Sequence, residues 1–160
     1  MRVEEVHGDL LDQDDVDALV NAWNRNVIPW WLLIPQGVSG ALKRRAGAAP
    51  FRELGYAPLP LGHARVTSAG RLPHAAIIHV AGINLLWTAS EASIRGSVRS
   101  AVHAAVERGF TSIALPVIGA GSGRFKEPEA AALILDTLAA LADEGVAPNL
   151  LVRLVRYAPG

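Results

Sequence analysis

The chain has no cysteine and no excess of charge of either sign. Its 160 residues include 15 Lys and Arg against 15 Asp and Glu, so the formal net charge at pH 7 is zero. The missing cysteine excludes disulfide bonds, thiol nucleophiles and cysteine-ligated zinc, and it fits a reducing cytosol. The balanced charge gives no broad electrostatic reason to bind nucleic acid or an anionic membrane surface.

Long apolar runs are also absent. Charges, prolines and glycines interrupt them well before a membrane-spanning length, and Met1–Val6 lacks the apolar stretch of a secretory signal. The histidines show no spacing typical of metal ligands, so we expect no metal and no cofactor. With 51% hydrophobic residues, the chain is expected to form a single cytoplasmic domain over residues 1–160.

Short apolar strands alternate with amphipathic helices along the chain. The pattern predicts strands at residues 3–6, 18–21, 63–68, 75–80, 112–117 and 150–155, and helices at residues 37–46, 94–105 and 129–141. This order predicts an α/β sandwich, in which a central sheet has helices on both faces. In such sheets, ligands bind beyond the carboxyl ends of the strands.

A glycine-rich segment, Pro116–Phe125, follows a predicted buried strand. Three glycines in five residues let backbone N–H groups approach and bind phosphate oxygens. The segment is not a P-loop, because Arg124 and Phe125 follow its last glycine, and its G-x-G-x-G spacing is not a dinucleotide fingerprint. Two interpretations stay open: a diphosphate cradle of another type, and an ordinary strand-to-helix turn.

Polar side chains follow the first two predicted strands. The Asp9 carboxylate could accept a hydrogen bond from an exocyclic amine such as that of adenine, or it could cap a turn. Asn21 and Asn24 could hold ribose hydroxyls, or they could bond locally to the backbone of a turn.

The segment Gly37–Ala41 nearly matches the nucleophile elbow G-x-S-x-G, with alanine in place of the last glycine. A serine hydrolase would also need a histidine and an acid nearby, and the residues before Gly37 make a poor strand. We therefore favour a helix N-cap over a nucleophile for Ser39.

The aromatic residues and one histidine each have two interpretations. Trp30 and Trp31 could cover a ligand or pack a loop onto the domain, and Phe125 could contact a ribose or belong to the core. His79, in an apolar predicted strand, is expected to be a hydrogen-bonded core residue and not a ligand-binding one.

Together these segments resemble a macrodomain, the ADP-ribose-binding α/β/α module, and the chain looks like a divergent bacterial-type member. The match runs from about Val6 to Leu141. Five segments carry it in order: Gly8–Leu10 resembles G-D-I, Val20–Asn24 resembles V-N-A-A-N, Gly37–Leu42 resembles G-V-D-G-A-I, Ile78–Gly82 resembles I-H-x-V-G, and Leu115–Gly123 resembles P-x-I-x-x-G. The resemblance implies a three-layer α/β/α sandwich with a central mixed sheet.

The resemblance also implies a role for each matching residue. Asp9 would bind the adenine amine with Leu10 beside it, and Asn24 would meet the distal ribose. Phe125 would flank that ribose. Two loops would bind the diphosphate: Gly37, Val38 and Ser39 form the first, and Gly119, Ala120, Gly121, Ser122 and Gly123 form the second.

The chain departs from the family pattern at the catalytic positions. Trp30–Gln36 replaces a glycine-rich run, and Ser39 replaces the aspartate that the family uses to activate water. Gly123 falls near the aspartate of the family's other catalytic arrangement. Serine is a poor base at neutral pH without a partner, so the carry-over leaves no clear catalytic acid or base.

The resemblance implies a protein that binds ADP-ribose and has ADP-ribosylated proteins as partners. In an ADP-ribosyl hydrolase, Asn24 would orient the distal ribose, and Ser39 could hydrogen-bond a water held near the anomeric carbon. The short chain without an appended module favours this enzyme. The alternative is a non-catalytic reader or metabolite-binding module, which the missing aspartate favours.

Overall fold

The computed structural model describes residues 1–24, 37–55, 59–83, 89–120 and 125–158. Trp30, Trp31, Gly121, Ser122 and Gly123 lie outside the described residues. For Asn24, Val38 and Ser39, the description covers the course of the backbone and not the side chain.

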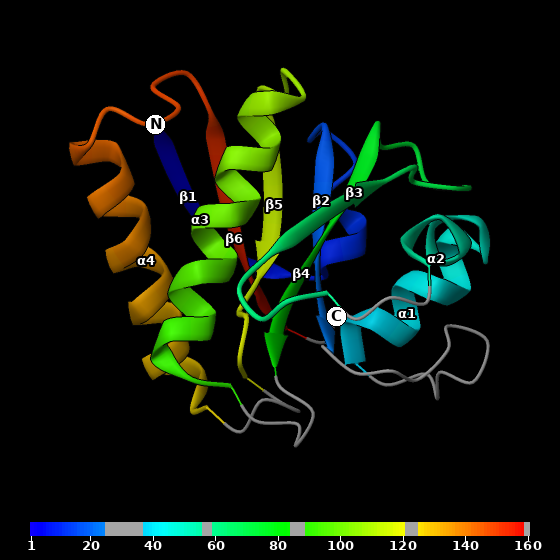
Figure 1. The fold of residues 1–160 in the computed structure, drawn as a ribbon, viewed down its shortest axis with the longest axis horizontal. Helices are drawn as coiled ribbons and strands as arrows, with labels where there is room; N and C mark the ends of the chain where they lie inside the picture. Colours follow the sequence, from blue (N-terminus) through cyan, green and yellow to red (C-terminus); the bar gives the residue numbers. More distant parts are fainter. Residues whose placement is uncertain (25–36, 56–58, 84–88, 121–124, 159–160) are drawn as a thin grey trace.

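Within the described residues, six strands form one mixed sheet in the order β1-β6-β5-β2-β4-β3 (Figure 1). The strands are β1 (Arg2–Gly8), β2 (Ala18–Asn24), β3 (Ala64–Thr67), β4 (Ala76–Ile83), β5 (Ser112–Pro116) and β6 (Leu151–Tyr157). Neighbouring strands are parallel, except that β3 is antiparallel to β4. The predicted strands are confirmed, and β2 and β4 continue past their predicted ends to Asn24 and Ile83.

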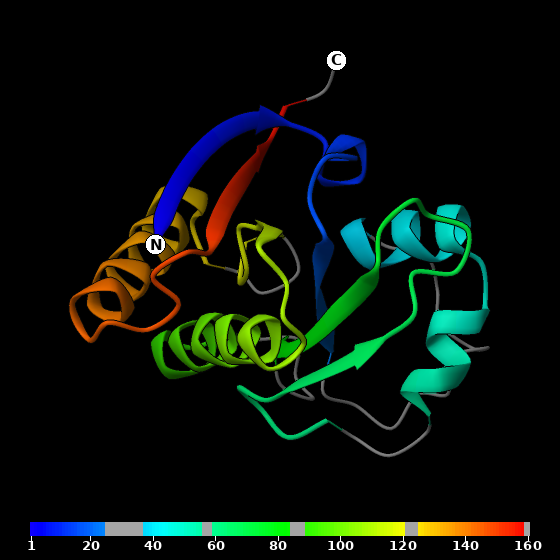
Figure 2. The same ribbon diagram turned by 90° about the horizontal axis from the view of Figure 1, so that it is seen from above.

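Helices cover both faces of this sheet, as the sequence pattern predicts. One face carries α3 (Glu91–Glu107) and α4 (Glu127–Asp143), and the other carries α1 (Gly37–Ala46), α2 (Ala49–Leu54) and the 3-10 turn η1 (Leu10–Asp12) (Figure 2). The sequence analysis missed α2, because six residues are too few to show helical periodicity. A proline in its first turn and Gly55 at its end fit a short helix.

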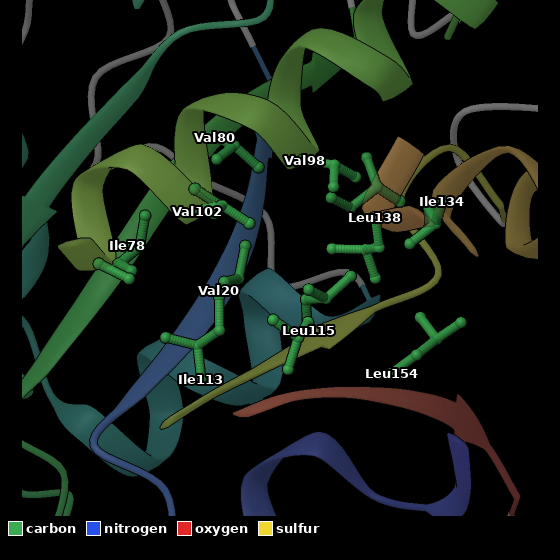
Figure 3. Close-up of a cluster of buried hydrophobic side chains, with 14 of the residues drawn as sticks. Val20, Ile78, Val80, Val98, Val102, Ile113, Leu115, Ile134, Leu138 and Leu154 are labelled. Atoms are coloured by element: carbon green, nitrogen blue, oxygen red, sulfur yellow. The ribbon is translucent and has the colours of Figure 1, made fainter. Parts of the chain in front are cut away.

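The larger core lies between the sheet and the α3/α4 layer. Figure 3 shows side chains from β2, β4, β5 and β6 meeting those of the two helices: Val20, Ile78, Ile113, Leu115 and Leu154 from the strands, and Val98, Val102, Ile134 and Leu138 from the helices. A smaller core on the other face packs η1, α1 and α2 against the sheet. Every residue of β5 is buried, as expected for a central strand covered on both sides.

A buried polar chain crosses the sheet on the α1/α2 side. Asn21 Nδ2 lies 3.1 Å from Nδ1 of His79, and His79 Nε2 lies 2.9 Å from Oγ1 of Thr67. An amide nitrogen only donates, so Nδ1 accepts and Nε2 carries the proton that it donates to Thr67. Thr67 in turn donates to the Ser68 carbonyl at 3.0 Å. The prediction that His79 is a hydrogen-bonded core residue is confirmed.

The environment of His79 keeps its ring neutral. The residue has no exposed surface, and its ring meets that of Phe51 edge to face, with centroids 5.7 Å apart. Burial, with a smaller contribution from the Arg65 charge, lowers the pKa of His79 from 6.5 to about 3.

A glycine is required in the turn that follows β5. Gly119 has a φ of +94°, and a Cβ there would lie 2.7 Å from Cδ1 of Ile94 on α3. Side chains rarely adopt such a φ, and atoms cannot approach so closely without displacement. The interpretation of this segment as a strand-to-helix turn therefore explains why residue 119 is a glycine, without reference to a ligand.

We expect His79→Gln to flatten the pH dependence of stability. Native His79 stays neutral, whereas in the unfolded state this residue takes up a proton below pH 6.5. His79 therefore lowers the free energy of unfolding by about 1.4 kcal/mol for each unit that the pH falls between about pH 6.5 and pH 3. Glutamine can still accept from Asn21 but does not titrate. Denaturant unfolding at several pH values measures the slopes, and equal slopes for both proteins above pH 4 would contradict the neutral buried ring.

We expect Gly119→Ala to lower the free energy of unfolding by about 2–4 kcal/mol, from backbone strain and the collision with Ile94. Gly109→Ala is the matched control, because φ is +72° there and no atom lies within 4 Å of the added Cβ. Adding Ile94→Val, which removes Cδ1, should recover part of the loss. Equal costs at the two glycines in urea denaturation would show that only the backbone conformation matters.

Candidate functional site

The carboxyl ends of β1, β6, β5, β2 and β4 lie along one edge of the sheet, the lower edge in Figure 1. Strands paired in parallel necessarily end on the same side. Most of the expected site residues belong to the segments that leave this edge, so segments far apart in sequence are brought to one place.

At the β1 end, Asp9 caps η1. Its Oδ1 accepts a hydrogen bond of 2.9 Å from the Leu11 backbone N–H, which confirms the cap interpretation. This bond engages one carboxylate oxygen, and the expected contact with adenine stays a prediction. Leu10 is 4% exposed and packs in the smaller core. It therefore has little surface with which to contact a ligand beside Asp9.

At the adjoining β6 end, Tyr157 is a residue that the sequence analysis missed. It pairs in register with Gly8, directly before Asp9, and it is 73% exposed. Val155 packs in the core on the η1 side, whereas Arg156 bonds to Glu127 of α4. Alternation along the strand therefore directs Tyr157 to the η1 side. The available signal was an aromatic residue directly after the apolar run of the last strand.

At the β5 end, a turn follows the strand. Its described residues Gly119, Ala120 and Phe125 are called the Gly119 loop. The Phe125 N–H donates to the Gly119 carbonyl at 2.9 Å, and Ala120 forms a bridge with Phe125. Phe125 is partly buried and packs against the larger core, which supports the core interpretation of its ring. The ion pair of Glu127 with Arg156 holds the first turn of α4 against β6, and it lowers the pKa of the Glu127 carboxyl.

At the β2 end, Asn21 and Asn24 have different surroundings. Asn21 lies inside the strand, fully buried and bonded to His79, so its interpretation as a turn residue is wrong. Asn24 is the last residue of β2, at a register shift in its pairing with β4. The structure thus separates a buried asparagine that belongs to the core from one at the edge of the sheet.

The helix α1 begins at Gly37 beyond this strand. Gly37, Val38 and Ser39 are its first three residues, so the N-cap interpretation of Ser39 is wrong: Ser39 lies inside the first turn. The first N–H groups of a helix lack partners within the helix and carry partial positive charge, which suits an anion. The basic run Lys43–Arg45 lies in the last turn of this helix, where positive charge suits the helix dipole.

The order of the strands orders these groups along the edge. Asp9 and Tyr157 lie at the β1/β6 end, the Gly119 loop lies in the middle, and Asn24 lies beyond it. β1 and β2 are three inter-strand spacings apart, or about 14 Å. Such a row suits an elongated ligand with a ring at one end, anionic groups in the middle and hydroxyls at the other.

The opposite edge of the sheet carries none of the expected site residues that the structure describes. An open hollow of about 400 Å³ lies there, lined in part by Glu53, Ser68 and Arg108. Among the described residues, no three His, Asp or Glu side chains are placed to hold a metal ion. No helix in the described ranges has the length and apolarity needed to cross a membrane.

Comparisons with known proteins agree with this architecture. The family model described as Macro domain matches residues 20–134. A Citrobacter rodentium protein called O-acetyl-ADP-ribose deacetylase is 31% identical over 157 residues, which cover 92% of this chain and 84% of that protein.

Solved structures share the fold. The Oceanobacillus iheyensis macrodomain with ADP has a TM-score of 0.81 and 27% identity, over 98% of this chain and 83% of that one. The Trypanosoma brucei macrodomain in complex with ADP-ribose has a TM-score of 0.79 at 24% identity, over 96% of this chain and 63% of that one. With a family model over most of its length and a relative aligned over most of both proteins, this chain belongs to the Macro domain family.

Proposed function

We propose that this protein binds ADP-ribose along the carboxyl edge of its sheet and hydrolyses ADP-ribose from ADP-ribosylated proteins. The observation that carries the proposal is the order of groups along that edge: Asp9 and Tyr157, then the Gly119 loop, then Asn24. Adenine, diphosphate and distal ribose follow one another in the same order in ADP-ribose.

The relatives support the choice of ligand. The Oceanobacillus macrodomain was solved with ADP, at 27% identity to this chain. The Citrobacter relative carries a name that refers to a hydrolysed ester of ADP-ribose. The first supports a site for the ADP part of the ligand at this edge, and the second supports a distal ribose that carries a hydrolysable group.

We assign the diphosphate to the two segments that leave the middle of the edge. One is the first turn of α1, at Gly37, Val38 and Ser39, where unpaired N–H groups and the helix dipole favour an anion. The other is the loop closed by the bond between Gly119 and Phe125. Anionic oxygens held between two backbone segments need no lysine or metal.

The assigned catalysis rests on positioning. Asn24 orients the distal ribose, while the phosphates and backbone N–H groups hold a water near its anomeric carbon. Ser39 can hydrogen-bond that water but cannot act as a strong base. This assignment predicts a slow enzyme whose rate depends on geometry more than on the titration of one residue.

A second function is favoured by Ser39 itself. Where the family sequence pattern has an aspartate, this chain has a neutral hydroxyl. A protein with the same pocket and no activation of water would be a reader that binds ADP-ribose and does not turn it over.

Single-turnover release of ADP-ribose from a protein modified on defined side chains separates the two functions, with a calorimetric titration of free ADP-ribose beside it. Binding with release supports the hydrolase, and the preferred linkage then identifies the substrate class. An assay with O-acetyl-ADP-ribose tests the ester named for the Citrobacter relative. Binding without release supports the reader, and the absence of binding rejects both.

We expect Asn24→Ala to lower the single-turnover rate by about a hundred-fold while the Kd for free ADP-ribose rises less than about ten-fold, because misplacement of the ribose mainly affects the reaction. Asn21→Ala is the contrasting variant. It removes a buried bond to His79 and should lower the unfolding free energy by about 1–3 kcal/mol. Equal losses of rate and affinity in Asn24→Ala would argue against its role in orientation.

We expect Asp9→Asn to weaken ADP-ribose binding by about ten-fold, the usual value of one lost hydrogen bond to a charged group. Asparagine can still accept from the Leu11 N–H, so η1 keeps its cap while the second acceptor oxygen is lost. Tyr157→Ala should weaken binding similarly if the ring meets the adenine. Titration with ADP-ribose and with ribose 5-phosphate provides the check: an adenine contact affects only the first ligand.

A further inference from the structure

We propose that Ser93, on α3, is a positioning residue for the candidate site, because it holds the bulge in β4 that faces Asn24. This inference rests on the proposed function for its effect on rate, but the contact itself is structural. Ser93 is 2% exposed and lies in the first turn of α3, which is not one of the segments assigned to the ligand.

The bulge lies where β2 ends. The register passes from Trp23 opposite Ala81 to Asn24 opposite Ile83, so Gly82 is left without a partner on β2. An extra residue on one strand bends that strand and increases the local twist, and bulges beside active sites re-aim the neighbouring side chains. The position of the Asn24 backbone relative to β4 therefore depends on what fixes Gly82.

Ser93 provides a partner for the bulge. Its Oγ lies 2.9 Å from the carbonyl oxygen of Gly82 and 3.0 Å from that of Ser90, so its one proton is shared between these two acceptors. An unpaired buried carbonyl is costly, and this hydroxyl offers the Gly82 carbonyl a donor from α3. The same oxygen accepts from the Ser90 N–H at 2.8 Å as part of the capping box of α3. The helix start and the strand end are thus joined through one side chain.

The first turn of α3 also packs against the Gly119 loop. A Cβ at Gly82 would lie 2.6 Å from Cγ2 of Ile118, so the Ile118 side chain takes up the space beside the bulge. Ile118 directly precedes Gly119, whose own missing Cβ makes room for Ile94. The bulge and the loop therefore pack on neighbouring residues of α3, Ser93 and Ile94. A shift at the bulge should also reach the loop.

The chain offers two matched controls. Ser90→Ala removes the side-chain cap of α3 but leaves the hydroxyl that bonds to Gly82. Ser97→Ala removes a second buried hydroxyl from the same helix. Ser97 Oγ would lie 3.7 Å from a Cβ at Gly82 but has no hydrogen-bond partner among the described residues, so this variant controls for packing beside the bulge. Ser93→Ala alone removes the bond to the bulge.

The experiment measures all three variants by single-turnover release, by ADP-ribose titration and by NMR of the free protein. We expect Ser93→Ala to lower the rate by about ten-fold to a hundred-fold with little change in Kd, since a shift of about 1 Å can cost a hundred-fold. Amide resonances of Asn24, Gly82 and Ile83 should shift or broaden in Ser93→Ala, and they should shift much less in both controls. Ser93→Cys has a weaker donor, so its rate and amide shifts should lie between those of the unmodified protein and Ser93→Ala. This variant replaces Ser93→Ala in the test if Ser93→Ala does not fold.

Two results would overturn the proposal. One is unchanged Asn24, Gly82 and Ile83 resonances in Ser93→Ala. The other is an equal loss of rate in Ser93→Ala and Ser90→Ala, which would assign the effect to the helix cap alone. If the unmodified protein neither binds nor releases ADP-ribose, the proposed function fails, and the NMR comparison alone decides whether Ser93 holds the bulge.

Discussion

The parallel pairing of β1, β6, β5, β2 and β4 is the constraint on which the candidate site depends. Parallel pairing requires each strand to end on the same side as its neighbour, and the connections must return across the faces as helices. One edge of the sheet therefore collects segments that are distant in sequence, such as Asp9 and Tyr157. The antiparallel β3 lies at the far end of the sheet and brings its amino end, not its carboxyl end, to this edge.

Two glycines allow close packing at this edge: Gly82 packs against the turn after β5, and Gly119 packs against α3. A side chain at Gly82 or Gly119 would collide with Ile118 or Ile94, respectively. Close packing at strand ends matters because tightly packed interiors transmit small displacements instead of absorbing them. The packing of α3 against the ends of β4 and β5 therefore constrains the geometry of this edge.

Much of the fold could be predicted from the sequence, because apolar periodicity reports burial directly. β5 and α4 were predicted within a few residues, since one is continuously apolar and the other repeats at helical spacing. The helix α2 could not be predicted from so short a segment. The bulge at Gly82 could not be predicted either, because the register depends on how two strands pair and not on the sequence of one strand.

The candidate site was only partly predictable, for a related reason. A residue type and its position predict what a side chain could do, but not which partner it meets first. By residue type, Asn21 and Asn24 could each hold ribose hydroxyls, yet Asn21 is bonded to His79 inside the sheet. Tyr157 was missed because a single aromatic residue after an apolar strand predicts core as readily as surface.

The exchange of an aspartate for Ser39 changes what the rest of the site must do. A carboxylate can accept a proton from an attacking water, whereas a serine hydroxyl only orients it. Any turnover must then come from the placement of water, phosphate and ribose relative to one another, and such contributions fall steeply with small displacements. A site that works by placement needs a rigid frame more than a site with a strong base does. The bond from Ser93 to the bulge and the packing of Ile94 under Gly119 provide such a frame on the side of the sheet opposite α1. A serine in place of the family aspartate and close packing at the strand ends are therefore compatible features of one site.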